Sequence, residues 1–140
     1  MNSYDLFISY NKNEKTLAQK LYNSFTKIDF TVFLDSKSIL PGESIPSAIS
    51  NAIENSTHMI CLISNDWLSS EFCKLERDIE IMDDPSAHDR KIIPLLVEDV
   101  ELPKMLKRLK YIDFKGWSTG YRKLFAELRK VVKKNVISRM

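Results

Sequence analysis

The chain has 140 residues, of which 44% are hydrophobic and 29% are charged, and this is enough for one domain with its own core. Two cysteines make no disulfide framework, and no apolar run approaches the ~18 residues of a membrane span. Because the N-terminus also lacks the basic start and apolar core of a signal peptide, we expect a cytoplasmic protein without a membrane partner.

The net charge of +2 is unevenly distributed along the chain. Residues 121–140 hold seven Lys or Arg and one Glu, so the other 120 residues are net acidic. Such a basic ending can contact an acidic partner or nucleic acid, but it is more often a solvated helix face. We therefore expect no direct nucleic-acid contact.

Five apolar segments alternate with helical patterns. The predicted strands cover residues 4–10, 30–34, 57–64, 92–97 and 111–114. The first predicted helix, residues 14–28, has an inward face of Leu17, Leu21, Phe25 and Ile28. In the second, Ser44 is the predicted cap, Pro46 lies in the first turn, and the apolar face is Ile45, Ala48, Ile49, Ala52 and Ile53. This order predicts an α/β fold, a flavodoxin-like open parallel sheet of five strands with helices on both faces.

The later elements follow the same alternation. Residues 57–64 form a nearly continuous apolar run, which is typical of a strand buried on both faces. Pro94 removes a ladder donor from the fourth strand, so we expect a bulge there or a place near the sheet edge. A short helix is predicted over 102–108. The last helix is predicted from about Tyr121, with inward residues Leu124, Phe125, Leu128, Val131 and Val132.

The helix predicted over residues 67–82 carries the most informative carboxylate. Its apolar stripe is formed by Leu68, Phe72, Leu75, Ile79 and Met82. At about 100° per residue, Glu76 falls at the border of this stripe, on the side of Ser69 and Phe72. Glu76 is thus either a partly desolvated reactive group or an ordinary boundary residue of a charged helix.

Several common uses of this fold do not fit the residues. The turn after the first strand, SYNKNE, has none of the glycines that a dinucleotide fingerprint or a P-loop requires. Asp66 follows the third strand, but the sequence shows no acidic partners that would help it hold Mg²⁺. No metal site is expected, because His58 and His88 share no ligand spacing with Cys61 or Cys73. His58 should be structural and Cys61 a buried small apolar residue.

Polar and aromatic residues gather where the strands end. The first strand delivers Ser9, Tyr10 and Lys12, and the second delivers Phe33 and Asp35. A polar loop with the turn Pro41-Gly42 follows. The third strand leads to Ser64 and to the helix with Glu76. This is a predicted cleft with aromatic walls and one principal carboxylate, and Trp67 is expected to pack at the start of that helix.

These segments resemble the TIR (Toll/interleukin receptor) domain. YDLFISY matches the first box of the family, Asp35 through ILPGESI resembles the second box and its mobile loop, and WLSSEFCKLE resembles the signature of the third helix. IIPLLV resembles the fourth strand, while the third box is only weakly present, as YIDF with Trp117. The resemblance covers residues 4–132 and is most like the bacterial NAD-cleaving members. It implies a single TIR domain over residues 1–140, and the basic ending suggests that this is a module of a longer chain that continues after the last helix.

The resemblance leaves two functions open. Some TIR domains are scaffolds, whereas others cleave NAD⁺ to nicotinamide and ADP-ribose or a cyclic isomer, and the catalytic Glu of these matches Glu76. The implied substrate-binding residues are Ser9, Tyr10, Lys12, Phe33, Asp35, Ser69 and Phe72. The implied assembly loop contains Ile39, Leu40, Pro41, Gly42, Glu43 and Ser44. Lys12 stands where active members often have Arg.

The reaction implied by this resemblance suits a site with one carboxylate. Nicotinamide leaves a pyridinium as a neutral molecule, so no acid is needed to protonate it. Glu76 can then either stabilise the positive charge on the ribose or hold a ribose hydroxyl. NAD⁺ is then the substrate and no cofactor is expected. The expected partners are other TIR domains and a sensor domain or protein, in bacterial antiphage defence. The alternative is a non-enzymatic interaction module that assembles through residues 35–44.

Overall fold

The computed structural model describes residues 4–34, 41–72 and 91–134. At its centre, five strands form one parallel sheet in the order β2-β1-β3-β4-β5. The strands are β1 (Tyr4–Ser9), β2 (Val32–Phe33), β3 (Ser56–Ile63), β4 (Ile92–Leu96) and β5 (Ile112–Asp113). This confirms the predicted fold class, although β2 and β5 are shorter than expected.

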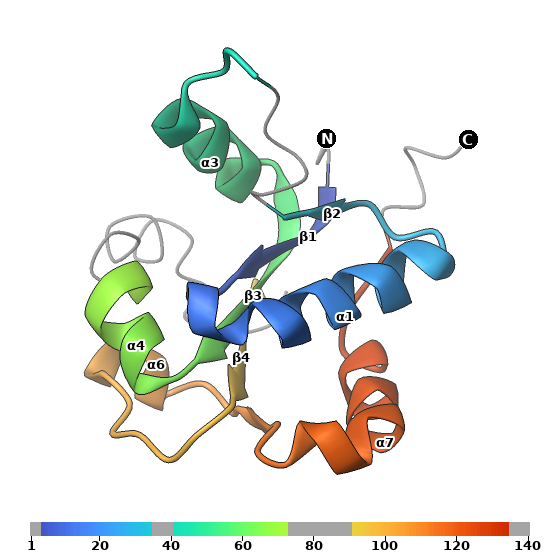
Figure 1. Ribbon diagram of the computed structural model, residues 1–140, viewed down its shortest axis with the longest axis vertical. Helices are drawn as coiled ribbons and strands as arrows, with labels where there is room; N and C mark the ends of the chain where they lie inside the picture. The colour runs from blue at the N-terminus through green and yellow to red at the C-terminus, as the bar shows by residue number, and fades with distance from the viewer. Residues whose placement is uncertain (1–3, 35–40, 73–90, 135–140) are drawn as a thin grey trace.

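Helices cover both faces of the sheet (Figure 1). One face is covered by α1 (Lys15–Lys27) and α7 (Trp117–Arg129). The other is covered by α3 (Ile45–Glu54), α4 (Asn65–Trp67), the π-helical turn η2 (Leu68–Phe72) and α6 (Lys104–Lys107). A short 3₁₀ turn, η1 (Lys12–Glu14), precedes α1.

The central strands separate two cores. In β3, Ile60 and Leu62 enter the core under α1 and α7, whereas Met59, Cys61 and Ile63 enter the core under the other helices. All five are fully buried, since successive side chains of a strand point to opposite faces. The prediction of a strand buried on both faces is therefore confirmed, as is the buried, apolar environment of Cys61.

Two buried polar groups tie chain segments to the sheet edges. The Asp5 carboxylate accepts from the backbone N–H of Thr31 at 2.7 Å and from the Thr31 hydroxyl at 3.1 Å, which fixes the start of β2 beside β1. His58 is fully buried, and its Nε2 accepts from the backbone N–H of Lys133 at 2.9 Å. His58 thus has the structural role expected of it, while the role of Asp5 was not predicted.

Pro94 lies within an unbroken ladder between β3 and β4, so the predicted bulge is not formed. Alternate residues of a parallel strand face opposite neighbours, and the carbonyl of Lys91 and the N–H of Val97 both bond to β3. Pro94 therefore faces the side of β5. There β4 is paired only at Leu95 and Leu96. The position near a sheet edge, which was the other predicted possibility, is confirmed.

Two helix predictions need correction at their ends. Ile28 was expected on the inward face of the first helix but is 38% exposed, because α1 ends at Lys27 and Ile28 already leaves the helical path. The last helix begins at Trp117 rather than at Tyr121. Gly116 precedes it with a φ of 74°, which glycine adopts at no steric cost, and Gly120 breaks the helical geometry within it.

Candidate functional site

The candidate site lies at the carboxyl ends of β1 and β3. The chain leaves β1 at Ser9 and passes through Tyr10 and Asn11 into η1. It leaves β3 at Ile63 and passes through Ser64 into α4 and η2. Because β1 and β3 are paired and parallel, the segments that follow them meet at one edge of the sheet.

Three side-chain hydrogen bonds join these two segments, and we call this set the clasp. Asn11 Nδ2 donates to Ser70 Oγ at 2.9 Å, and Asn13 Nδ2 donates to Asp66 Oδ2 at 2.6 Å. The Ser64 hydroxyl donates to the Glu14 carboxylate. The loop after β1 is therefore bonded to the start, the first turn and the π-helical turn of the segment after β3.

Trp67 anchors the same region from inside the core. Its side chain is fully buried, its ring lies 5.7 Å from that of Phe72, and its Nε1–H donates to Ser9 Oγ at 2.9 Å. Ser64 caps the helix start by accepting from the Trp67 backbone N–H at 3.0 Å. Trp67 therefore has the packing role that was expected of it.

The helix predicted over residues 67–82 differs from a regular α-helix where it is described. It begins two residues earlier, at Asn65, and continues from Leu68 to Phe72 as a π-helical turn. A π-helical turn advances by less than 100° per residue, so the expected angle between Leu68 and Glu76 no longer follows from the sequence. Glu76 itself lies outside the described residues. Such turns are frequent at functional sites.

Three carboxylates surround the start of this segment. Burial raises the pKa of Glu14 above its ordinary value, the bond from Ser64 opposes this, and the nearby charges of Asp66 and Glu98 raise it further. Glu98, which follows β4, accepts from the backbone N–H of Asn65 at 2.5 Å. Glu14 and Glu98 come near the start of this segment because strands distant in sequence end at the same edge of the sheet.

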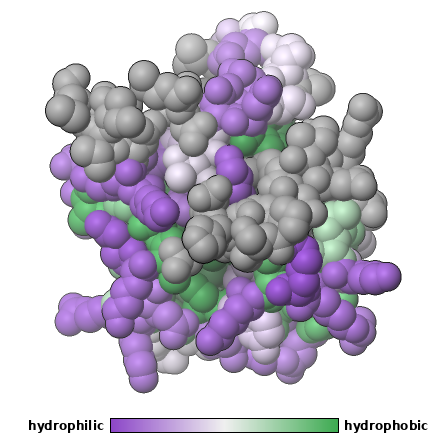
Figure 2. Space-filling view, turned by 180° about the vertical axis from the view of Figure 1, so that it is seen from behind, coloured by the Kyte–Doolittle hydropathy of each residue, from purple (hydrophilic) through white to green (hydrophobic). Residues whose placement is uncertain are grey.

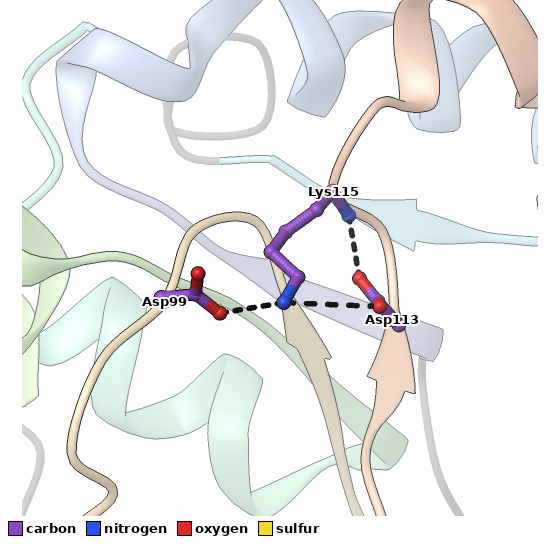
Figure 3. A network of polar contacts seen from close by, with 3 residues as sticks. All are labelled: Asp99, Asp113 and Lys115. Atoms are coloured by element: carbon purple, nitrogen blue, oxygen red, sulfur yellow. Dashed lines mark hydrogen bonds and ion pairs between the residues drawn. The ribbon is translucent and has the colours of Figure 1, made fainter.

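These acids do not make a metal site. In residues 4–34, 41–72 and 91–134, no three His, Cys, Asp or Glu side chains gather closely enough to hold a metal ion. Farther along the edge, a lysine neutralises two more acids (Figure 3). Lys115 Nζ lies 2.6 Å from Asp99 Oδ1 and 3.9 Å from Asp113 Oδ2, and the bond to Asp99 raises the pKa of Lys115. This exposed network joins the segments that follow β4 and β5.

The predicted substrate-binding residues fall into two groups. Tyr10 is half-buried, while Lys12 and Ser69 are exposed beside the clasp. Ser9 is buried and accepts from Trp67, and Phe72 is 8% exposed. Phe33 is only 2% exposed and stacks on Phe7, with ring centroids 5.2 Å apart. The structure thus places Phe33 in the core and not on an open aromatic wall.

The predicted assembly loop is described only in part. Asp35, Ile39 and Leu40 lie outside the described residues. Pro41, Gly42, Glu43 and Ser44 are exposed. Gly42 has a φ of 91°, as the predicted turn requires, and Ser44 precedes α3 without a side-chain capping bond. The loop therefore ends on the surface, beyond the edge strand β2.

A separate groove lies at the opposite edge of the sheet. It has a volume of about 430 Å³ and runs beside the first half of β4, which among the described residues has no partner on the β5 side, with α7 on its far side. Its lining is mostly apolar, and Tyr111 at its rim is 42% exposed. Seen from behind, the described surface is mostly hydrophilic, with apolar side chains visible in the recesses between polar ones (Figure 2). None of the described helices is long and apolar enough to cross a membrane.

Comparisons with known proteins agree with this architecture. The family model for the TIR domain matches residues 6–128. The chain is 29% identical over 101 residues to mouse Toll-like receptor 13, and the match covers 69% of this chain and 10% of the receptor.

Two solved structures extend the likeness to nearly the whole chain. The TIR domain of the Toll-related receptor TRR-2 from Hydra magnipapillata superposes with a TM-score of 0.68 at 25% identity, covering 91% of this chain and 99% of that domain. A metazoan TIR-STING receptor from C. gigas, solved in complex with 2′,3′-cGAMP, gives a TM-score of 0.75 at 26% identity, covering 95% of this chain and 40% of that one.

The chain spans only a small part of the receptor and less than half of the TIR-STING protein. These three proteins are metazoan, so the likeness to bacterial NAD-cleaving members stays a prediction. The family itself is shown by the match over residues 6–128 and by the sheet order and helices already described. The chain belongs to the TIR domain family.

Proposed function

We propose that this TIR domain is an NAD⁺ glycohydrolase that cleaves the bond between nicotinamide and ribose, with Glu76 as the catalytic carboxylate. The observation that supports this most is the joining of the loop after β1 to the segment after β3 by the clasp. That segment reaches Phe72, and only three residues separate Phe72 from Glu76 in the sequence. Glu76 therefore comes, in sequence, shortly after the segment that the clasp bonds to the loop with Lys12.

The proposed step needs one carboxylate and water. The bond between ribose C1′ and the pyridinium nitrogen breaks, and its electron pair leaves with nicotinamide, which becomes neutral. Glu76 stabilises the positive charge that develops on the ribose. Water then adds its oxygen to C1′ and releases a proton to solvent, which gives ADP-ribose. Attack by a group of the same molecule instead gives a cyclic isomer.

Lys12 supplies a positive charge next to the clasp, at an edge that also carries Glu14, Asp66 and Glu98. It is exposed on η1, one residue from Asn11 and Asn13, both of which are bonded to the segment after β3. A lysine there suits the pyrophosphate of NAD⁺ as a point charge. Ser69 is exposed on the other segment of the clasp, whereas Tyr10 packs partly against the core under α1 and α7. Phe33 could stack on a ring of NAD⁺ only if its own ring first left the core.

The second candidate function is a non-enzymatic module that assembles with other TIR domains. It is favoured by the apolar groove beside β4, which lies at the edge of the sheet opposite to β2 and its loop. One copy can then offer residues 35–44 to the groove of the next. The two functions are compatible, because assembly can also complete the NAD⁺ site, and the enzyme would then be more active per molecule at high concentration.

The context we propose is an output module controlled by a sensor. The TIR-STING receptor pairs a TIR region with a further part and was solved with a cyclic dinucleotide. By analogy, this chain would act in the cytoplasm downstream of a sensor domain or protein, in bacterial antiphage defence. Its own trigger would be whatever ligand that sensor binds.

The deciding experiment measures NAD⁺ consumption by the purified domain over a concentration series. The variants are wild type, Glu76→Ala and Glu76→Gln, with Glu54→Ala as the matched control, because Glu54 is exposed on α3. We expect cleavage per molecule to rise with concentration and to fall about 100-fold or more in both Glu76 variants. Glu54→Ala should match wild type.

Two results would separate the candidates. If wild type stays inert even when fused to a forced oligomer, the enzymatic proposal is wrong. If Ile39→Asp with Leu40→Asp, or Tyr111→Asp in the groove, leaves self-association unchanged, the assembly proposal is wrong.

A further inference from the structure

Three residues from the end of β1 to η1 are bonded to the segment after β3. Ser9, Asn11 and Asn13 are each bonded to the segment after β3, through Trp67, Ser70 and Asp66 respectively. Between them, Lys12 is exposed and Tyr10 is half-buried. The bonded residues thus hold the loop against its neighbour, while Lys12 stays exposed and Tyr10 packs partly against the core under α1 and α7.

Glu14 makes one more contact with the segment after β3, through the Ser64 hydroxyl. A hydroxyl group has one hydrogen and two lone pairs. The Ser64 hydroxyl uses its hydrogen for Glu14 and a lone pair for the Trp67 backbone N–H. An acceptor at Glu14 therefore orients Ser64 to cap the helix, and the same Trp67 holds Ser9 through its indole.

The contact between Glu14 and Ser64 needs an acceptor oxygen and not a negative charge. The Glu14 carboxylate is partly desolvated and lies near two other acids, Asp66 and Glu98, so the ionised form is disfavoured where it stands. A neutral acceptor such as glutamine would accept the same bond without this cost. Glutamate and glutamine should therefore orient Ser64 alike.

We propose that Glu14 is a positioning residue of this site, which acts through Ser64 to hold the loop with Lys12 in register with the π-helical turn with Ser69. The inference rests on the proposed NAD⁺ cleavage and goes beyond it, because Glu14 was not among the predicted site residues. Glu14 touches no reacting atom. It sets the distance between two segments that contact the same substrate.

The test compares Glu14→Ala, Glu14→Gln and the control Glu54→Ala at a concentration at which wild type cleaves NAD⁺. Glutamine keeps an oxygen that accepts from Ser64, whereas alanine does not. We expect Glu14→Ala to lower kcat/KM about tenfold and Glu14→Gln to stay within about twofold of wild type. Circular dichroism at the assay temperature must show all variants folded.

NMR spectroscopy tests the position of Trp67 without any substrate. The two tryptophans give two indole N–H signals in a ¹⁵N–¹H correlation spectrum, and Trp117→Phe assigns them. Glu14→Ala should shift the indole and backbone N–H signals of Trp67, and Glu14→Gln should leave them near their wild-type positions.

Each other outcome overturns a specific claim. Equal losses in Glu14→Ala and Glu14→Gln would mean that the charge or proton of Glu14 matters, which contradicts a positioning role. Full activity and unshifted Trp67 signals in Glu14→Ala would also overturn the inference while leaving the NAD⁺ proposal intact. A wild type that never cleaves NAD⁺ would overturn both.

Discussion

Replacing Trp67 with phenylalanine tests how the second core supports the edge of the sheet. The change removes the indole N–H that donates to Ser9 and leaves a void around a fully buried position. The lost hydrogen bond costs about 1 kcal/mol. A void of roughly 40 Å³ at ~24 cal/mol per Å³ adds about 1 kcal/mol. We therefore expect the free energy of unfolding to fall by about 2 kcal/mol.

The assay is urea denaturation followed by far-UV circular dichroism, because the substitution itself alters tryptophan fluorescence. Trp117→Phe is the matched control, since Trp117 is only half-buried at the start of α7. A double-mutant cycle with Ser9→Ala isolates the indole bond, and its coupling energy should be about 1 kcal/mol. If Trp67→Phe costs no more than Trp117→Phe and the coupling is zero, the reasoning is refuted.

Three further predictions follow from buried groups. Asp5→Ala should lower the free energy of unfolding by about 2 kcal/mol. Asp5→Asn should lower it by less, because asparagine still accepts from Thr31. Equal losses for the two variants in urea denaturation would contradict this. Burial raises the pKa of Cys61 to about 12, so in a Cys73→Ser background a thiol reagent at pH 8 should react only as fast as the protein unfolds. The raised pKa of Glu14 means that the native state binds more protons than the unfolded state as pH rises above 4.5, so the wild type loses stability with rising pH. The free energy of unfolding of Glu14→Gln, measured by urea titration, should therefore gain on that of wild type between pH 4 and 7. A difference that stays constant over this range would refute the prediction.

The sheet could be predicted because its central strands carry their pattern in consecutive residues. In β3 the run from Met59 to Ile63 is apolar at every position, and only a strand covered on both faces buries all of it. The element ends were less predictable. Ile28 continues the helical spacing in sequence, yet the chain leaves the helix at Asp29, which has a φ of 67°. Spacing alone does not show where a helix stops.

The site was predicted in outline but not in its contacts. The carboxyl ends of β1 and β3 could be named, since parallel strands end at one edge. The pairing of Glu14 with Ser64 spans 50 residues, and no local pattern links them. Phe33 was misplaced for a related reason. A strand-end aromatic can face either a cleft or the core, and only the positions of Phe7 and Tyr4 decide which.

The orientation of Pro94 has a consequence for how copies of this chain behave in solution. Because β5 pairs only with the end of β4, the part of the chain that the structure describes leaves the first half of β4 without a partner on that side, and open strand edges recruit further strands into aggregates. Pro94 presents no N–H on that open side, so a strand arriving there finds an incomplete ladder. Copies that meet at this edge must then join through side chains in the groove. That favours contacts that can form and separate again over irreversible extension of the sheet.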